Sequence, residues 1–421
     1  MMWSLLRRNS AFRKLFTAQV ISYGGDWFAA VAAIGLLLEF TGSDFLASAF
    51  WVAQTLPTFI MGPIAGPVAD RFDRRKILII ASFAQAIMAL TFLLAGHGAP
   101  WIVFVAQGGV AALGSFFGPA AQAGVPNIVE EKDLATATSM MAATWGAMLA
   151  VGAALGALFT VAFGRNAAFI ADSASFVIAA LLILSIRESL QASGTSRVYT
   201  ERMHPIRDTR EALSHARSHP AIMALIGSHI GFGFGAGVVG MLAVLATVKF
   251  HGSDGAIGLL LAGRGVGVVL GPLLITRLVA RGIHGVLLAC GFAAIGYGTM
   301  YLGVAIAPWL VLAAIGVMLA HLGGGAQWAL TIYGLQLLTP DELRGRIFAA
   351  DAALVTLAMS LSLVFSGLMS GVIGPSATIA IIGGGSLLWG IVFLFLTRVL
   401  RAEAETEALA VHPLAVETEL T

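Results

Sequence analysis

The 421-residue chain has very little charge. Only 11% of its residues are charged, whereas 58% are hydrophobic, and the mean hydropathy is +0.90. A soluble domain carries about a quarter charged residues, because its surface faces water. Most of this surface must therefore face lipid. The single cysteine, Cys290, excludes an internal disulfide and any metal site built from a pair of cysteines.

The sequence also lacks the motifs of several common enzyme classes. It contains no Gly-x-x-x-x-Gly-Lys phosphate loop, no His-Glu-x-x-His zinc motif and no Gly-x-Ser-x-Gly nucleophile motif. The loops are short, and the net charge of +2 does not suggest a nucleic-acid partner. We therefore expect no enzyme activity, no cofactor, no metal and no bound nucleic acid.

What the sequence does contain is a succession of apolar segments, each long enough to cross a bilayer. A spanning helix needs about 20 apolar residues. Twelve candidate spans lie at 15–38, 45–69, 77–96, 101–124, 135–163, 167–186, 220–248, 255–279, 285–304, 306–338, 347–372 and 376–397. The composition and these spans predict an all-α polytopic membrane protein embedded in the lipid bilayer.

The polar segment 187–219 divides these spans into six and six. It separates an N-terminal half, 1–186, from a C-terminal half, 220–398, and a tail follows at 399–421. The later part of the segment, 206–218, fits either a short basic helix lying on the membrane surface or a plain linker.

The basic residues predict the orientation. With the N-terminus inside, all of the 24 Lys and Arg residues except Arg165, Lys249 and Arg264 fall in cytoplasmic segments. Because short cytoplasmic loops carry an excess of Lys and Arg, this asymmetry predicts that both termini are cytoplasmic. We expect a multi-pass protein of the bacterial inner membrane.

The two halves share short repeated words. Three matches recur at an offset of 209 or 210 residues: Gly24 with Gly233, Gly42-Ser43-Asp44 with Gly252-Ser253-Asp254, and Gly62-Pro63 with Gly271-Pro272. These collinear matches indicate two homologous six-helix halves related by an axis along the membrane normal. In that arrangement a substrate site forms near the midplane, between the halves.

The loop between the second and third spans carries the sharpest motif, Gly66-Pro67-Val68-Ala69-Asp70-Arg71-Phe72-Asp73-Arg74-Arg75-Lys76. It resembles the Gly-x-x-x-Asp-Arg-x-x-Arg-Arg/Lys signature of the major facilitator superfamily. The resemblance implies a twelve-helix transporter fold. It also implies that Asp70 meets the start of the eleventh span near Arg346 and latches the cytoplasmic side closed. The latch residues would be Gly66, Asp70, Arg71, Arg74, Arg75 and Arg346. The alternative is a basic loop that only sets topology.

Two further segments narrow the resemblance to one branch. They run from Phe117 to Leu134 and from Gln336 to Arg346. Both look like the branch that includes bacterial siderophore, macrolide and other drug exporters.

Polar residues inside the spans are the mechanistic candidates, because a charge at the bilayer centre costs about 2.5–3.5 kcal/mol unless it faces a cavity or a partner. Asp26 and Arg264 are the proton-coupling candidates, and their alternative is a structural ion pair. The resemblance places spans one, four, seven and ten around a central cavity, and thereby suggests His229, His321, Gln327 and Trp328 as substrate-cavity candidates. Each histidine could instead bond a helix carbonyl, and Trp328 could simply pack against other helices.

These features predict a secondary transporter that exports a small amphipathic molecule in exchange for protons and works as a monomer. A proton-coupled nutrient importer is the first alternative. A membrane-embedded enzyme or assembly factor on the same fold is the second, suggested only by His229 beside Ser228.

Overall fold

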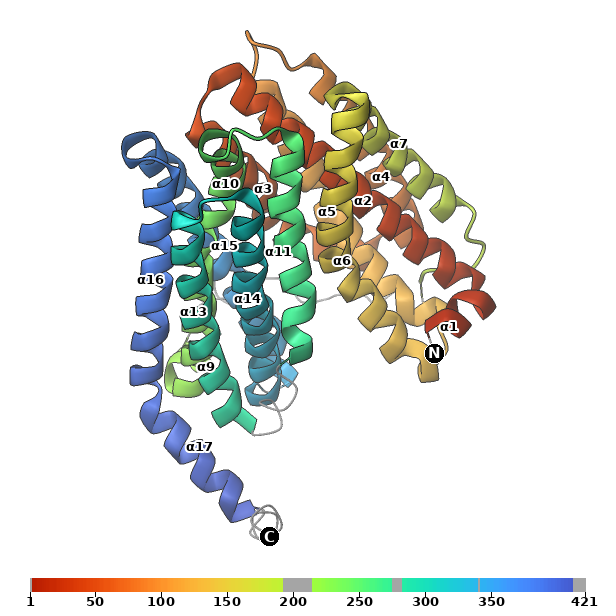
Figure 1. Cartoon of the computed structure of the whole chain (residues 1–421). Coiled ribbons are helices and arrows are strands. Elements are labelled where there is room, and N and C mark those ends of the chain that lie inside the picture. Colours follow the sequence, from red (N-terminus) through yellow and green to blue (C-terminus); the bar gives the residue numbers. More distant parts are fainter. Residues whose placement is uncertain (1, 192–213, 275–281, 340, 412–421) are drawn as a thin grey trace.

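The computed structural model describes residues 2–191, 214–274, 282–339 and 341–411, and these are almost entirely helical (Figure 1). Twelve helices are long and apolar enough to cross a membrane, which confirms the predicted number of spans. The predicted basic helix in the linker lies mostly outside the described residues.

The N-terminal half contains a short helix and six long ones. They are α1 (Met2–Arg8), α2 (Ser10–Thr41), α3 (Asp44–Arg71), α4 (Arg74–Leu90) with the 3-10 turn η1 (Thr91–Leu94), α5 (Trp101–Ile128), α6 (Glu131–Phe163) and α7 (Arg165–Leu184). The C-terminal half contains α9 (Pro220–Gly235), α10 (Gly237–Val244), the π-helical turn η2 (Leu245–Lys249), α11 (Asp254–Leu274), α13 (Gly282–Ile306), α14 (Leu310–Leu338), α15 (Asp341–Ile373), α16 (Pro375–Leu396) and α17 (Arg398–Val411).

Local sequence explains where several of these helices begin and end. Gly42 ends α2 with a left-handed backbone, at φ 58°, which glycine adopts without steric cost. The Ser43 side chain then caps α3 by accepting a hydrogen bond from the amide of Leu46. Asp73 caps α4 in the same way through the amide of Lys76. This acidic residue of the loop motif therefore has a structural role at a helix start.

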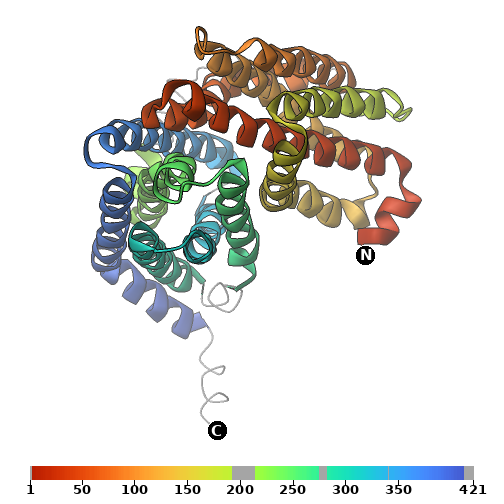
Figure 2. The same cartoon turned by 45° about the horizontal axis from the view of Figure 1, so that its top comes forward.

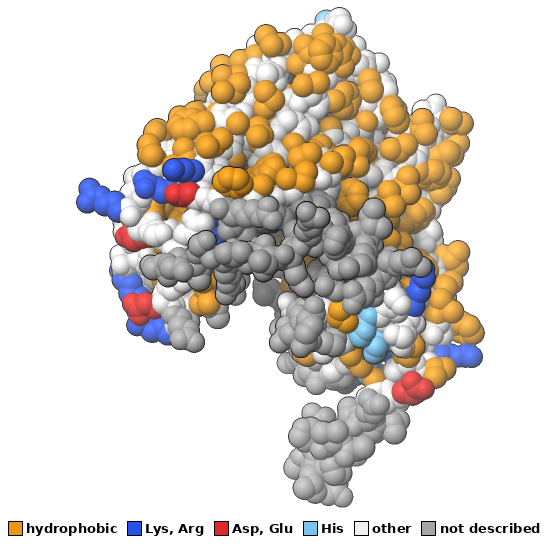
Figure 3. Space-filling model, turned by 180° about the vertical axis from the view of Figure 1, so that it is seen from behind, with side chains coloured by type: hydrophobic (Ala, Val, Ile, Leu, Met, Phe, Trp, Pro, Cys, Tyr) orange, Lys and Arg blue, Asp and Glu red, His pale blue; other side chains and the backbone are white. Residues whose placement is uncertain are grey.

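The two halves form two bundles that lie side by side (Figure 2). They meet at one end of the molecule, which we call the closed end. At the other end, which carries α1 and α17 (Figure 1), they diverge, and we call this the open end. Figure 3 shows the molecule hollowed between the halves on that side.

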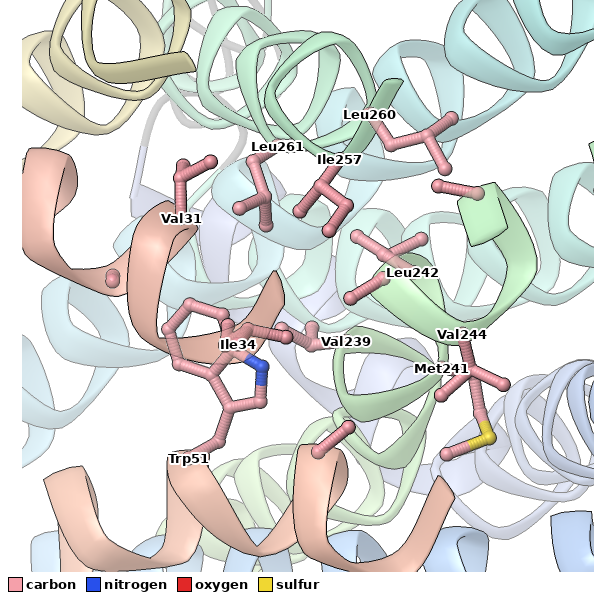
Figure 4. Packing of buried hydrophobic residues seen from close by; sticks show 14 of the residues in the cluster. Val31, Ile34, Trp51, Val239, Met241, Leu242, Val244, Ile257, Leu260 and Leu261 are labelled. Atoms are coloured by element: carbon pink, nitrogen blue, oxygen red, sulfur yellow. The ribbon is translucent and has the colours of Figure 1, made fainter. Parts of the chain in front are cut away.

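Hydrophobic packing follows the same division. One cluster of buried residues spans both halves at the closed end, where Ile34 and Trp51 lie near Val239, and Val31 lies near Leu261 (Figure 4). Two further clusters lie toward the open end, and each draws its buried residues from one half only. The halves therefore share a core at the closed end and keep separate cores at the open end.

Polar contacts between the halves also lie at the closed end. The Ser48 hydroxyl on α3 donates to the Leu363 carbonyl on α15 at 2.7 Å. The Ser370 hydroxyl donates to Asp44 Oδ2 at 2.5 Å. In a medium without water such bonds satisfy groups that lipid could not.

Small residues let α6 and α11 touch across the boundary between the halves. A Cβ added at Gly258 would lie 2.0 Å from the Cβ of Ala157, and one added at Gly265 would lie 2.3 Å from the backbone nitrogen of Ala150. No real side chain fits at such distances, so glycine is required for this approach. Arg264, next to Gly265, is held at this crossing.

Candidate functional site

Asp26 lies in the middle of α2 and faces α7. The neighbouring Gly25 packs so closely on α7 that an added Cβ would lie 2.7 Å from Asp172 Oδ1 and 2.1 Å from Ser175 Oγ. Asp172 is only 1% exposed, and its Oδ1 has no hydrogen-bond partner among the described residues. The Asp26 and Asp172 carboxyl groups interact electrostatically. We call these two groups, which no hydrogen bond joins, the carboxyl pair of the N-terminal half, and Asp26 is its partly exposed member.

Arg264 on α11 makes no ion pair with Asp26 or with any other described residue. Its guanidinium carbon lies instead 5.9 Å from the ring centroid of Trp51 on α3 and 5.9 Å from that of Trp145 on α6. The Trp27 ring lies 5.9 Å from the Trp51 ring and 6.5 Å from the Trp145 ring. In this conformation the two proton-coupling candidates therefore occupy different surroundings.

Three of the four cavity candidates come together in the C-terminal half. His229 on α9 lies with its ring centroid 4.7 Å from that of Trp328 on α14. The Gln327 Nε2 donates to the Ser228 carbonyl at 3.0 Å and to its hydroxyl at 2.9 Å. The first contact places a ring of α9 on a ring of α14, and the second joins the same helices through a side chain and the backbone.

His229 also contacts a residue that sequence reasoning missed. Its Nδ1 lies 2.7 Å from Asp351 Oδ2 on α15, and the two side chains are 1% and 5% exposed. His229 Nε2 and Asp351 Oδ1 have no partner among the described residues. The signal was present, because Asp351 is an ionisable residue inside a predicted span, just as Asp26 is.

The fourth cavity candidate, His321, lies apart from this group. Its Nδ1 lies 3.1 Å from the Val317 carbonyl, one turn earlier in α14, and 3.4 Å from the Tyr301 hydroxyl. The first contact is the helix-carbonyl bond weighed as an alternative in the sequence analysis.

The latch residues are described only in part. The surroundings of Gly66 and the side chains of Asp70, Arg71 and Arg346 are not among the described parts of the chain, so the predicted contact between Asp70 and Arg346 stays a prediction. Arg74 Nη1 donates to the carbonyls of Ala123 at 2.8 Å and Leu190 at 3.2 Å, and Arg75 donates to that of Leu184. These bonds attach the loop to the rest of its own half.

A second ionic site that sequence reasoning missed joins the halves at the closed end. Arg165 at the start of α7 contacts Glu39 on α2, and its Nε lies 2.9 Å from Asp254 Oδ2 on α11. These residues line a cavity of about 330 Å³. Asp254 belongs to the repeated Gly-Ser-Asp word, and Arg165 was one of three basic residues outside the cytoplasmic segments. Those two signals could have suggested the pair.

Twelve apolar helices in two halves, with ionisable side chains inside the spans, are the architecture of a transporter of the major facilitator type, and the family and its relatives are transporters rather than enzymes. The chain belongs to the transmembrane secretion effector family of this superfamily, whose profile matches residues 2–420.

Related bacterial proteins support this assignment. The chain is 24% identical to YfiS, an MFS-type transporter of Bacillus subtilis, over 93% of this chain and 94% of that protein. It is 25% identical to macrolide efflux protein A of Streptococcus pyogenes, over 86% and 90% of the two chains. It is also 25% identical to the multidrug efflux pump Tap of Mycolicibacterium fortuitum, over 93% and 97%.

Solved structures share the fold at low sequence identity. A bacterial homologue of the human lysosomal transporter Spinster, in an inward-facing and unoccupied conformation, matches with a TM-score of 0.68 and 18% identity over 95% of this chain and 97% of that chain. A mutant of the peptide transporter POT matches with a TM-score of 0.76 and 11% identity over 94% and 96%.

Proposed function

We propose that this protein is a proton-coupled exporter of small amphipathic molecules in the bacterial inner membrane, working as a monomer by alternating access. The family assignment and the macrolide and multidrug efflux relatives support export. The fold alone does not determine the direction of transport, because proteins with other transport functions, such as a peptide transporter, share it.

The predicted orientation in the membrane identifies the state of the transport cycle to which this conformation belongs. If both termini are cytoplasmic, the open end faces the cytoplasm and the closed end faces outward. The structure is then the inward-facing state, in which a substrate enters between the halves from the cytoplasm. Arg165 and the shared hydrophobic core hold the outer side shut, and the loop motif would act in the opposite, outward-facing state.

The carboxyl pair of Asp26 and Asp172 carries the coupling proposal. Two carboxylates that interact in a poorly hydrated site repel each other, so binding of one proton to the pair relieves that repulsion. Asp26 is the partly exposed member and can exchange its proton with water, whereas Asp172 is buried. A change in the separation or hydration of this pair as the halves rock would release the proton on the other side.

The experiment compares two modes of transport in proteoliposomes containing purified protein and a labelled amphipathic compound, chosen by first screening anionic, neutral and cationic compounds for movement by the wild-type protein. We expect Asp26→Asn to keep counterflow, which needs only binding and rocking, and to lose accumulation driven by an imposed pH gradient. Glu130→Gln is the matched control, because it makes the same exchange of a carboxyl group for an amide at an exposed residue outside the spans, where the carboxylate pairs with Lys132. Wild-type accumulation by Asp26→Asn would show that Asp26 is not the coupling group.

A further inference from the structure

Arg264 is a cation without a counterion near the middle of a spanning helix. It lies ten residues after Asp254, the first residue of α11, or about 15 Å along the helix. Its Nε is buried without a hydrogen-bond partner, and it forms no ion pair with any described residue. An arginine at this depth costs about 2.5–3.5 kcal/mol, so it needs a compensating group.

The acids inside the spanning helices do not supply that group. Asp26 interacts with Asp172 and makes no ion pair with Arg264, and Asp351 is bonded to His229. The groups that interact electrostatically with the guanidinium in its own half are the phenols of Tyr297 and Tyr301 and the imidazole of His321. The site has an excess of positive charge.

Tryptophan rings flank the cation from the other half. Trp51 is 4% exposed and forms a wall, whereas Trp145 is 46% exposed and presents open ring surface. A cation over an aromatic ring gains about 0.5–2 kcal/mol. This attraction leaves the guanidinium N–H donors without acceptors, because a ring face is not a carboxylate.

We propose that Arg264, Trp51 and Trp145 form a binding site for an amphipathic aromatic anion, in which a carboxylate pairs with the guanidinium and an aromatic ring stacks on Trp145. This rests on the proposed export function and names the class of its substrate. The cation comes from the C-terminal half and the rings from the N-terminal half. A bound anion therefore contacts both halves at once, and its binding depends on the distance between them.

The test measures binding alone, with three probes that share one ring system: 2-naphthylacetate, its neutral amide and the cationic 2-naphthylethylamine. Calorimetric titration of the purified full-length protein in detergent needs no pH gradient. We expect wild type to bind the acetate about tenfold more tightly than the amide, and the amine more weakly still. Arg264→Gln should bind acetate and amide equally, and Arg264→Lys should keep a reduced preference because lysine lacks the planar fork.

Two further variants separate charge from stacking. Trp145→Ala should weaken the acetate and the amide alike and leave their ratio unchanged. Lys249→Gln is the matched control, because Lys249 also lies over a ring, that of Phe250 at 5.3 Å, but at the closed end. It should behave as wild type.

Retention of amide binding by Arg264→Gln shows that this variant is folded. If it does not fold, the acetate preference of Arg264→Lys decides whether the guanidinium binds the anion. An undiminished preference for the acetate in Arg264→Gln, or in Arg264→Lys when that variant decides, overturns the proposal. So does wild type that binds the three probes equally, prefers the amine, or binds none. These outcomes are independent of coupling. Loss of proton-driven transport in Asp26→Asn supports the coupling proposal even if the wild-type protein shows no preference for the acetate, and that combination overturns the anion site alone.

Discussion

The two halves repeat their turns but not their buried charges. The repeated Gly-Ser-Asp word lies at the same kind of place in both, where Asp44 begins α3 and Asp254 begins α11. The polar groups in the interior differ. The N-terminal half holds two carboxyl groups, Asp26 and Asp172, whereas the C-terminal half holds a histidine bonded to a carboxyl group and the separate cation Arg264.

This difference separates what builds the fold from what acts in it. Turn and packing residues are needed in each half, because each bundle must close its own loops and pack its own helices. A buried pair of like charges repels unless it binds a proton, whereas a histidine and a carboxyl group attract each other and share a hydrogen bond, here between His229 Nδ1 and Asp351 Oδ2. We therefore expect the N-terminal pair to serve coupling and the C-terminal pair to stabilise its half.

The largest effect on stability is expected from removing one member of the His229–Asp351 pair in the C-terminal half. Asp351→Ala removes the partner of a buried imidazole, and we expect a loss of about 3 kcal/mol. Asp172→Ala, its counterpart in the other half, removes a carboxyl group that repels Asp26 and should change stability little. Thermal unfolding in detergent, followed by tryptophan fluorescence, compares the two. Equal losses would contradict the assignment of different roles.

A smaller effect is expected where α2 meets α7. Gly25→Ala would place a methyl group 2.1 Å from Ser175 Oγ, and overpacking of this kind costs about 1–3 kcal/mol. It should also separate Asp26 from Asp172 and weaken proton-driven accumulation more than counterflow. Gly62→Ala on α3 is the control, because nothing lies within 4 Å of its added Cβ. If Gly25→Ala matched this control in both assays, the close approach would not matter for coupling.

The smallest effect is expected at the ionic contact that joins the halves. Arg165→Gln removes partly exposed ion pairs worth about 0.2–1 kcal/mol. The outward-open population should therefore rise about 1.4- to fivefold. Spin labels on Ser43 and Ser253, in a Cys290→Ser background, measure the distance between the two halves at the closed end. High salt should reproduce part of the change in wild type. A distance distribution unchanged by Arg165→Gln would remove this contact from the gate.

The sequence by itself determined the class of fold, the number of spans and their division into halves. These follow from the length of apolar segments and the repeat, and both are readable along one dimension. It also determined how deep in the membrane two charged residues lie, because the count of residues from a helix end places Asp26 and Arg264 near the middle of their helices.

Only the tertiary structure decided which side chains meet. Asp26 and Arg264 have compatible depths, yet Asp26 faces Asp172 and Arg264 faces Trp51 and Trp145. The direction in which a helix faces is set by its packing against other helices. Here Gly25 of α2 packs against α7, and Gly265 of α11 packs against α6. In a helix that is apolar all round, lipid and protein demand similar residues, so the sequence pattern does not mark the buried face. The partnership of His229 with Asp351, 122 residues apart, was hidden for the same reason.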